Sequence, residues 1–586
     1  MKGMQRRTVL KQLGGATATL AVAGMGSAAS LAGFGQEPRN PATTGILLNQ
    51  VGLLPGHDKV ATVRSASPSA PGAEFRLRAA AGGKVVYQGA LSSPQLDAAS
   101  GDQVRLAQFS SFTTPGSYRL EVDTGSSEPF LIAPKVYAPA LRLAMRSYYG
   151  QRCGCAVDLG NGYKHPACHA DGAYHVSSGR QGSVPNHGGW HDAGDYGRYV
   201  VNSGITTGTL LWAWELYPQV LEHLSLDIPE SGRRLPDYLA EIRWNLEWML
   251  SLQDADGGVW HKQTSEQFCA FIMPEQDHLT SYVIGTGAEP YKNTTATADL
   301  ASVAAIAARC YRPYDAAFAD RCLLAARRAW TWAMAHPQVP FTNPAHVGTG
   351  GYADQHCADE LLWASAELWR TTGEPQYEQA FLAGMGDRVV VAAPSWGDVG
   401  PLALWTYVLA GREGNRAQKD RIRAATATAA TTLVAHAQQS GYGTTMGLTD
   451  YVWGSNAVAA NQSLLLLIAD RFAPNRSCAE AALGNLHYLL GRNCHGVSWV
   501  TQVGTHPFEH PHHRPSAADG IAAPWPGLLS AGPCSGHGDE VARAMPAMPP
   551  MRRWADDQRA YSMNEIAINW NAPLVFLLAA ANPTAL

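Results

Sequence analysis

Two aspartates in a glycine-containing segment are the residues whose types and spacing most clearly suggest chemistry. Asp192 and Asp195 lie three residues apart within residues 188–200, among glycines and aromatic side chains. Carboxylates at this spacing in a tight turn can converge on one water molecule and polarise it. The simpler interpretation is that an Asp-x-x-Asp pair beside glycine forms a turn or a helix cap. The pair is therefore a candidate catalytic site that needs a partner elsewhere in the chain.

Glu565 is such a partner. It is the one acidic residue in a largely apolar, helical pattern over residues 561–572. Burial in such surroundings raises the pKa of a carboxyl, and carboxylates are rarely buried without a partner or a function. One ionised carboxylate that activates a water, opposite one protonated carboxyl, forms the two-carboxylate arrangement of glycosidases.

Three segments resemble the hallmark blocks of family 9 glycoside hydrolases. They are residues 188–200, residues 498–504 continuing to 511–514, and residues 554–572. The middle segment departs once, because His506 stands where the family usually has Asn, Lys or Arg. The last segment is the most specific, and its matching positions are Trp554, Asp556, Tyr561, Glu565, Ala567, Asn571 and Ala572. The resemblance covers the chain from about Ile46 to its end.

The resemblance implies a mechanism and a substrate class. It implies hydrolysis of β-1,4-glucosidic bonds in cellulose or related β-glucans with inversion at the anomeric carbon, and we expect endo action. Asp195 would be the general base, Asp192 would help to hold the water, and Glu565 would be the general acid. His512 and Arg514 match positions that hydrogen-bond the sugar beside the scissile bond. Trp453 and Tyr561 are further candidates for the substrate cleft.

Two alternatives remain open at this stage. An exo-acting cellobiohydrolase, β-glucosidase or exo-glucosaminidase is compatible with His506 and with an insertion over residues 276–295, which is rich in turn residues. A carbohydrate-binding protein that lost its activity would need a substitution at one of the three carboxylates, and the sequence shows none.

Composition limits the class of partner. Charged residues make up 16% of the 586 residues and the net charge is -4, so neither nucleic acid nor an anionic membrane is indicated. The 17 Trp and 22 Tyr suit a neutral polymer, since aromatic faces stack on sugar rings. We expect a monomer that acts on a β-glucan polysaccharide or oligosaccharide, without an organic cofactor.

The first 30 residues resemble a twin-arginine export signal. Arg6 and Arg7 precede a short apolar run rich in Ala and Gly. The alternative of a membrane anchor is disfavoured because glycines interrupt the run. We therefore expect a periplasmic or secreted protein without a membrane span after the signal is removed.

Two domains follow the signal. Residues 41–134 contain seven short apolar runs separated by turn residues, which predicts a β-sandwich; it also resembles the immunoglobulin-like module of one family 9 subgroup. From residue 135 to 586 the pattern has a helical period, with twelve helices and no strand run expected. Paired helices of this number suggest a closed barrel, and the resemblance implies an (α/α)6 catalytic barrel.

Four residues form a candidate zinc site. Cys153, Cys168, His169 and His191 supply two thiolates and two imidazoles, the donors of a tetrahedral zinc. The intervals between them are not those of a standard zinc finger. The resemblance supports the site, because the subgroup has a structural zinc in this region and the first three residues match its ligands. Two alternatives stay open: His187 in place of His191, and Cys155 in place of Cys153.

Asp354, Asp359 and Glu360 form a candidate calcium site. Carboxylates and loop carbonyls gather around residues 348–360, and oxygen ligands are those that calcium prefers. The alternative is that Asp359 and Glu360 simply occupy the first turn of a helix. The resemblance implies a calcium site nearby.

Overall fold

The computed structural model describes residues 45–64, 73–387 and 389–582. The expected export signal lies outside the described residues. Within them, no helix is both long enough and apolar enough to cross a membrane.

The first part of the described chain is a sandwich of two antiparallel sheets. One sheet has the order β1-β2-β6-β5, and the other has the order β4-β3-β7-β8 with β9 also paired to β7. All seven predicted strands are present. Their bounds are β1 Ile46–Leu47, β2 Val60–Arg64, β3 Glu74–Ala79, β4 Val85–Ala90, β5 Gln95–Leu96, β6 Gln103–Gln108, β7 Gly116–Val122, β8 Gly125–Ser126 and β9 Phe130–Ile132. Alternate side chains such as Phe75, Leu77 and Leu120 fill the core between the sheets.

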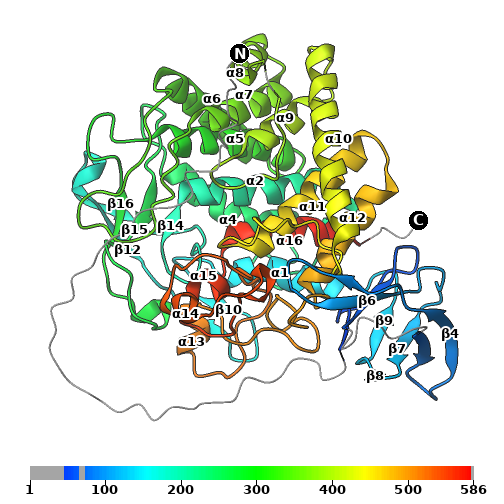
Figure 1. Cartoon of the computed structure of the whole chain (residues 1–586). Helices are drawn as coiled ribbons and strands as arrows, with labels where there is room; N and C mark the ends of the chain where they lie inside the picture. The colour runs from blue at the N-terminus through cyan, green and yellow to red at the C-terminus, as the bar shows by residue number, and fades with distance from the viewer. Residues whose placement is uncertain (1–44, 65–72, 388, 583–586) are drawn as a thin grey trace, which may run out of the picture. The chain divides into compact units, whose positions relative to one another are not determined.

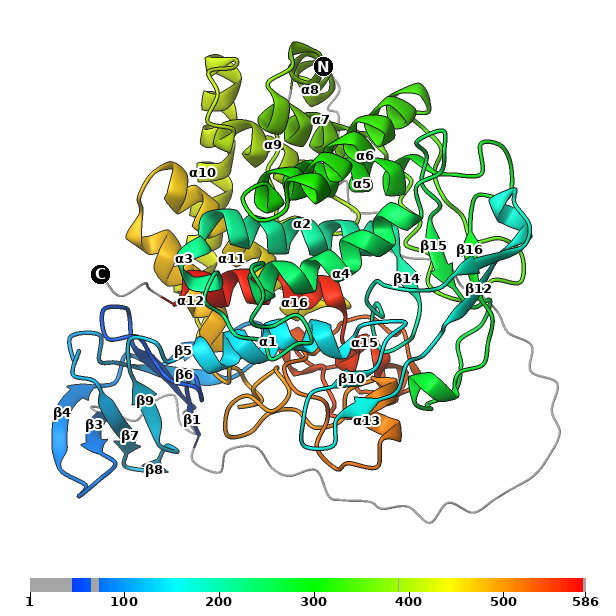
Figure 2. The ribbon, with the colours of Figure 1, turned by 180° about the vertical axis from the view of Figure 1, so that it is seen from behind.

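In the described residues, twelve helices of ten or more residues follow, at the positions where helical periodicity predicted them. Figures 1 and 2 show their arrangement. Their bounds are α1 Ala138–Gly150, α2 Val200–Leu216, α4 Asp237–Ser251, α5 Thr294–Tyr311, α6 Ala316–Ala335, α7 Ala358–Thr372, α8 Pro375–Met385, α9 Gly400–Leu409, α10 Arg416–Gln439, α11 Ser455–Phe472, α12 Arg476–Leu489 and α16 Ile568–Ala580. The shorter helices are α3 Pro218–Leu221, α13 Arg514–Ala518, α14 Glu540–Ala544 and α15 Tyr561–Asn564.

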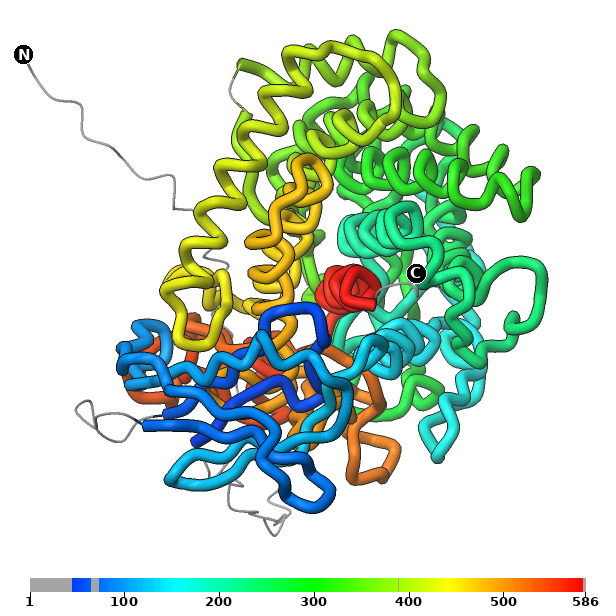
Figure 3. Tube along the Cα trace, turned by 90° about the vertical axis from the view of Figure 1, so that its right-hand side faces the viewer, coloured from blue at the N-terminus to red at the C-terminus, as the bar shows by residue number. Residues whose placement is uncertain are grey.

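The long helices pack as an (α/α)6 barrel, in which inner and outer helices alternate along the chain. The inner helices α2, α5 and α16 are buried on nearly every side, whereas the outer helix α10 buries only four side chains. Helix α2 packs against α5 and α16, and α16 packs against α11. Figure 3 shows α16 end-on in red, between α2 and α11. Helices that are buried on nearly every side therefore lie inside, and a helix that buries one stripe of side chains lies outside.

The prediction of no strand in the helical domain is wrong. Short strands lie in the loops: β10 Val157–Asp158, β11 Lys164–His165, β12 Asp171–Tyr174, β13 Ser183–Pro185, β14 Arg198–Tyr199, β15 Lys262–Thr264 and β16 Ser281–Ile284. Five of them form one sheet in the order β13-β12-β16-β15-β14. Strands of two to four residues are too short to show a period of two in the sequence.

This sheet changes the interpretation of the 276–295 insertion. Strand β16 comes from the insertion and lies between β12 and β15. The residues after it fold back, since Gly287 N donates to Ser177 O at 3.0 Å. Four residues of the insertion therefore form an internal strand of the sheet, and the edge strand β14 of that sheet begins three residues after Asp195.

The sequence pattern predicted that Glu565 lies within a helix, and this prediction is wrong. It is the extended residue between α15 and α16, with φ −62° and ψ 155°. Its backbone forms a bridge to His512 instead. The break between the two helices lets its side chain leave the barrel core and face the aspartates.

Candidate active site and metal cluster

Three segments distant in sequence meet through backbone hydrogen bonds at one end of the barrel. Ile568 N donates to Asp192 O at 2.8 Å, and Arg514 N donates to Gly194 O at 3.2 Å. His512 N donates to Asn564 O at 2.9 Å. These are the three segments that carry the family resemblance, so the structure brings Asp192, Asp195, Glu565 and Arg514 into one site.

Gly194 is the point of closest approach between the segments. A Cβ atom on it would lie 2.0 Å from the His512 carbonyl oxygen, which no side chain tolerates. Its carbonyl accepts hydrogen bonds from the backbone N and Nη1 of Arg514. Glycine between the two aspartates is therefore required by packing rather than by a turn.

Asp192 is held rigidly on both oxygens. It is buried, and Asn202 Nδ2 donates to Oδ1 and the Tyr352 hydroxyl to Oδ2, each at 2.6 Å. Burial and the neighbouring Asp195 raise its pKa, while the two donors oppose that rise. Asn202 and Tyr352 were not found by sequence reasoning, because a polar residue in α2 and a tyrosine in a loop have no distinguishing local pattern.

Asp195 is held on one oxygen only. Gly197 N and the Tyr199 hydroxyl both donate to Oδ2, at 3.0 and 3.1 Å, so Oδ1 is the oxygen better placed to accept a hydrogen bond from water. Burial raises the pKa of Asp195, but the Arg514 guanidinium and these donors act against it. Of the two aspartates, Asp195 therefore has the better stabilised negative charge.

Glu565 is in the opposite electrostatic situation. Burial raises its pKa well above the ordinary value, and the charges of Asp195 and Asp192 raise it further. Arg514 and the Gly194 amide only partly oppose these effects. The site thus separates a carboxyl that keeps its proton from a carboxylate that can accept one.

The four expected substrate contacts lie around this group. His512 packs its ring against Phe271 and Tyr561, with centroids 4.9 and 5.8 Å apart. Trp453 is 50% exposed and its ring centroid lies 5.4 Å from that of Tyr561, so the partly buried Tyr561 extends an aromatic surface that is open to solvent at Trp453. Arg514 donates to the carbonyls of Gly194 and Cys269, so in this structure its guanidinium braces the backbone beside the carboxylates.

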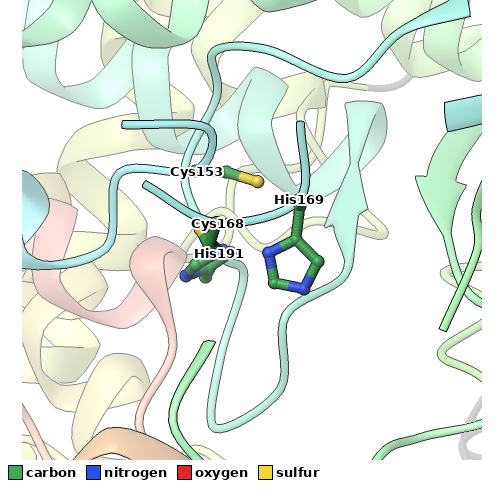
Figure 4. A group of neighbouring side chains, drawn as sticks. All are labelled: Cys153, Cys168, His169 and His191. Carbon is green, nitrogen blue, oxygen red and sulfur yellow. Dashed lines mark hydrogen bonds between the residues drawn. The ribbon is translucent and has the colours of Figure 1, made fainter. Parts of the chain in front are cut away.

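The four predicted zinc ligands converge on one point. One ligand atom from each of Cys153, Cys168, His169 and His191 lies within 4.8 Å of the others, and Figure 4 shows Cys153 and His169 pointing into a shared space. Neither alternative ligand belongs to this group: His187 is exposed, with Nδ1 3.3 Å from Gly154 O, and Cys155 is also outside it. All ten cysteines are free.

The chemistry of this cluster fits a bound cation. His169 Nε2 lies 3.3 Å from Asp277 Oδ2, while its buried Nδ1 has no hydrogen-bond partner. A histidine oriented by a carboxylate through one nitrogen typically binds a metal through the other. Burial acts to raise the pKa of the Cys153 thiol, but Cys168 and the Arg198 guanidinium lower it overall, which favours a thiolate ligand.

The predicted calcium ligands Asp354, Asp359 and Glu360 also lie near one another, but they are less closely grouped than the four residues of the Cys153 cluster. Asp359 and Glu360 do occupy the first turn of α7. Burial and the charges of Asp359, Asp299 and Asp354 raise the pKa of Glu360, and buried oxygens of Glu360, Asp299 and Asp354 have no hydrogen-bond partner. Asp299 was not predicted, although a lone acid in the apolar helix α5 was a usable signal. Among the described residues, only the Cys153 cluster brings three or more possible metal-ligand atoms within 4.8 Å of one another.

Comparison with known families identifies the protein class. The glycosyl hydrolase family 9 model matches residues 137–578, and the cellulase N-terminal Ig-like domain model matches residues 42–127. The chain belongs to glycosyl hydrolase family 9. It is a glycoside hydrolase with an N-terminal Ig-like domain and a helical catalytic barrel.

Several relatives cover most of this family 9 chain. It is 37% identical to Endoglucanase D of Acetivibrio thermocellus, over 91% of the chain and 83% of the relative. It is 34% identical to a xyloglucan-specific endo-beta-1,4-glucanase of Bacteroides ovatus, over 92% and 94%. A cellodextrinase of Butyrivibrio fibrisolvens is 32% identical, over 91% and 99%.

Solved structures support the same fold. A single mutant of a thermostable endoglucanase from Alicyclobacillus acidocaldarius superposes with a TM-score of 0.85 at 32% identity, covering 92% of this chain and all of the other. A zinc-binding triple mutant of a family 9 endoglucanase gives a TM-score of 0.83 at 36% identity, covering 91% of this chain and all of the other.

The contact at Gly194 generates a direct prediction. Gly194→Ala should lower kcat by about 100-fold or more, because moving the His512 backbone displaces Arg514 and Glu565 from the aspartates. Gly56→Ala is the matched control, since a Cβ there meets no atom within 4 Å. Steady-state kinetics and thermal melting of both variants check this. A Gly194→Ala enzyme with unchanged kcat would show that this contact does not set the geometry.

Proposed function

We propose that the protein is an inverting endo-β-1,4-glucanase that acts on cellulose or a related β-glucan. The observation that supports it most is the contrast between the carboxyl environments: Glu565 is favoured in its protonated form, and Asp195 has donors and a cation that favour its charge. Such a pair can protonate a leaving oxygen and deprotonate a water in one step.

The roles follow from the contacts. Asp195 accepts a proton from the attacking water at Oδ1, while its Oδ2 stays bound by Tyr199 and Gly197. Asp192 helps to hold the same water, and its fixed orientation comes from Asn202 and Tyr352. Glu565 donates its proton to the glycosidic oxygen. The exposed faces of Trp453 and Tyr561 would stack on sugar rings of the chain.

The assignment of the carboxyls is tested by neutralising each one. Asp195→Asn and Glu565→Gln should each lower kcat on an unactivated glucan by about 100- to 10,000-fold. An aryl glycoside with a good leaving group needs little protonation, so it should partly restore the activity of Glu565→Gln and not that of Asp195→Asn. Asp123→Asn, at an exposed position of the sandwich, is the control. Equal rescue of both variants would contradict the roles, and NMR of the wild-type reaction should show an α-anomer first.

Endo action is supported by two of the relatives described above, which are endoglucanases. The predicted result is a steep fall in the viscosity of carboxymethylcellulose while few reducing ends form, because internal cuts shorten the polymer fastest. Exo action is the outcome to test against. Release of only glucose, cellobiose or glucosamine from the start, with little change in viscosity, would contradict endo cutting.

We also propose that the Cys153 cluster holds a structural zinc and that the acidic residues around Glu360 hold calcium. The purified protein should contain about one zinc per chain, and Cys153→Ser should lose it, whereas Cys155→Ser should keep it. A strong chelator should lower the melting temperature before it lowers activity. Glu360→Gln should reduce bound calcium and leave zinc unchanged. Zinc retained in Cys153→Ser, measured by elemental analysis, would contradict the ligand set.

We propose that the protein acts outside the cytoplasm and as a monomer. Support comes from the twin-arginine-like residues 1–30, whose export route accepts folded, metal-loaded proteins. A zinc site and ten cysteines of which none forms a disulfide in the described residues suit folding before export.

A further inference from the structure

One buried cation beside the active site has only neutral hydrogen-bond partners among the described residues. The Lys262 side chain on β15 is fully buried, and its four hydrogen bonds go to Asn343 Oδ1 at 2.8 Å, Gly350 O at 2.7 Å, and Thr349 Oγ1 and O at 3.1 and 3.3 Å. A buried ammonium without a paired charge costs considerable free energy. Its presence in a small sheet next to the catalytic segment therefore indicates a specific task.

A continuous series of hydrogen bonds leads from this lysine to the general base. Gly350 N donates to the Tyr199 hydroxyl oxygen at 3.1 Å, and that hydroxyl donates to Asp195 Oδ2 at 3.1 Å. Because the Tyr199 oxygen already accepts the Gly350 hydrogen, its own hydrogen is directed towards the carboxylate. Tyr199 and Lys262 are also direct cross-strand partners between β14 and β15, and Nζ lies 5.5 Å from the Tyr199 ring centroid.

We propose that Lys262 is a positioning residue for the general base, which it orients through the loop at Thr349–Gly350 and the hydroxyl of Tyr199. The ammonium binds the loop oxygens, the loop amide fixes the Tyr199 hydroxyl, and the hydroxyl fixes Oδ2 of Asp195, so that Oδ1 is presented to the water. The inference rests on the proposed role of Asp195 as the base.

The charge of Lys262 supports the same role as its hydrogen bonds. Burial lowers the pKa of Lys262 to about 7, and the charge of Asp195 opposes that effect. The attraction is mutual, so the protonated lysine also favours the ionised form of Asp195. The other titratable or charged groups that act on Asp195 are Asp192, Tyr199, Arg514 and Glu565. Loss of either the Tyr199 hydroxyl or the lysine charge should raise the pKa of Asp195.

The test uses the full chain and pH profiles of kcat/KM on a soluble β-glucan. Lys262→Met should lower kcat by about 10- to 100-fold with little change in KM, and it should move the acidic limb of the profile to higher pH, since that limb reports the base of the free enzyme. Tyr199→Phe should shift the limb in the same direction. Lys292→Met is the matched control: Lys292 is also nearly buried, but it pairs with Asp254 at 2.7 Å, and its removal should leave the limb in place.

A double variant separates positioning from a general structural role. If Lys262 positions the base through Tyr199, the double variant Lys262→Met with Tyr199→Phe should be no slower than the slower single variant on the plateau of the pH profile, where Asp195 is ionised in every variant. Multiplied losses in the double variant, or an acidic limb that does not move in Lys262→Met, would overturn the inference. If Lys262→Met does not fold, Asn343→Leu removes one acceptor of Nζ and should shift the limb in the same direction, and an unchanged limb there would equally overturn it.

The Asp195→Asn and Lys262→Met variants distinguish an error in the role of Lys262 from an error in the role of Asp195. An inactive Asp195→Asn together with a wild-type profile in Lys262→Met would overturn only the role of Lys262. An active Asp195→Asn would overturn the proposed base and, with it, this inference.

Discussion

The burial of three neighbouring carboxyl groups is the constraint on which the rest of the site depends. Asp192, Asp195 and Glu565 cannot all be ionised in so small and buried a space, because like charges there repel strongly. Burial raises the pKa of Glu565, the charges of the two aspartates raise it further, and both effects favour its protonated form. The close approach of Gly194 to the His512 backbone allows this proximity, so the packing of a glycine contributes to the protonation of an acid.

The proposed metal site and the small sheet hold the catalytic segment from its two sides. His191, directly before Asp192, belongs to the Cys153 cluster, and its amide donates to Gln151 O at 2.6 Å. On the other side, β14 follows Asp195 after two residues and pairs with β15. The aspartates thus lie on a short span between two anchored ends, which provides precision in a region of loops.

Sequence patterns predicted the helices well and the small sheet not at all. An apolar period sustained over ten or more residues, as in α5, is a strong local signal. Strand β14 consists of two residues, and its partner β15 lies more than sixty positions later, so only tertiary contacts define the pairing. The carboxyls were found because acids beside glycine or in apolar surroundings are unusual. Tyr352, which binds Asp192 from a loop 160 residues away, had no such signal.

The cations of the site stabilise charge without contacting it through a salt bridge, and this arrangement has a chemical consequence. Arg514 directs its hydrogen bonds to the carbonyls of Gly194 and Cys269, and Lys262 directs its own to neutral oxygens of the 349–350 loop and Asn343. A guanidinium in bidentate contact with Asp195 would lower the pKa of that carboxyl so far that it would be a weak base. Cations held on backbone oxygens instead favour the carboxylate at a distance and leave one of its oxygens for the proton of the water.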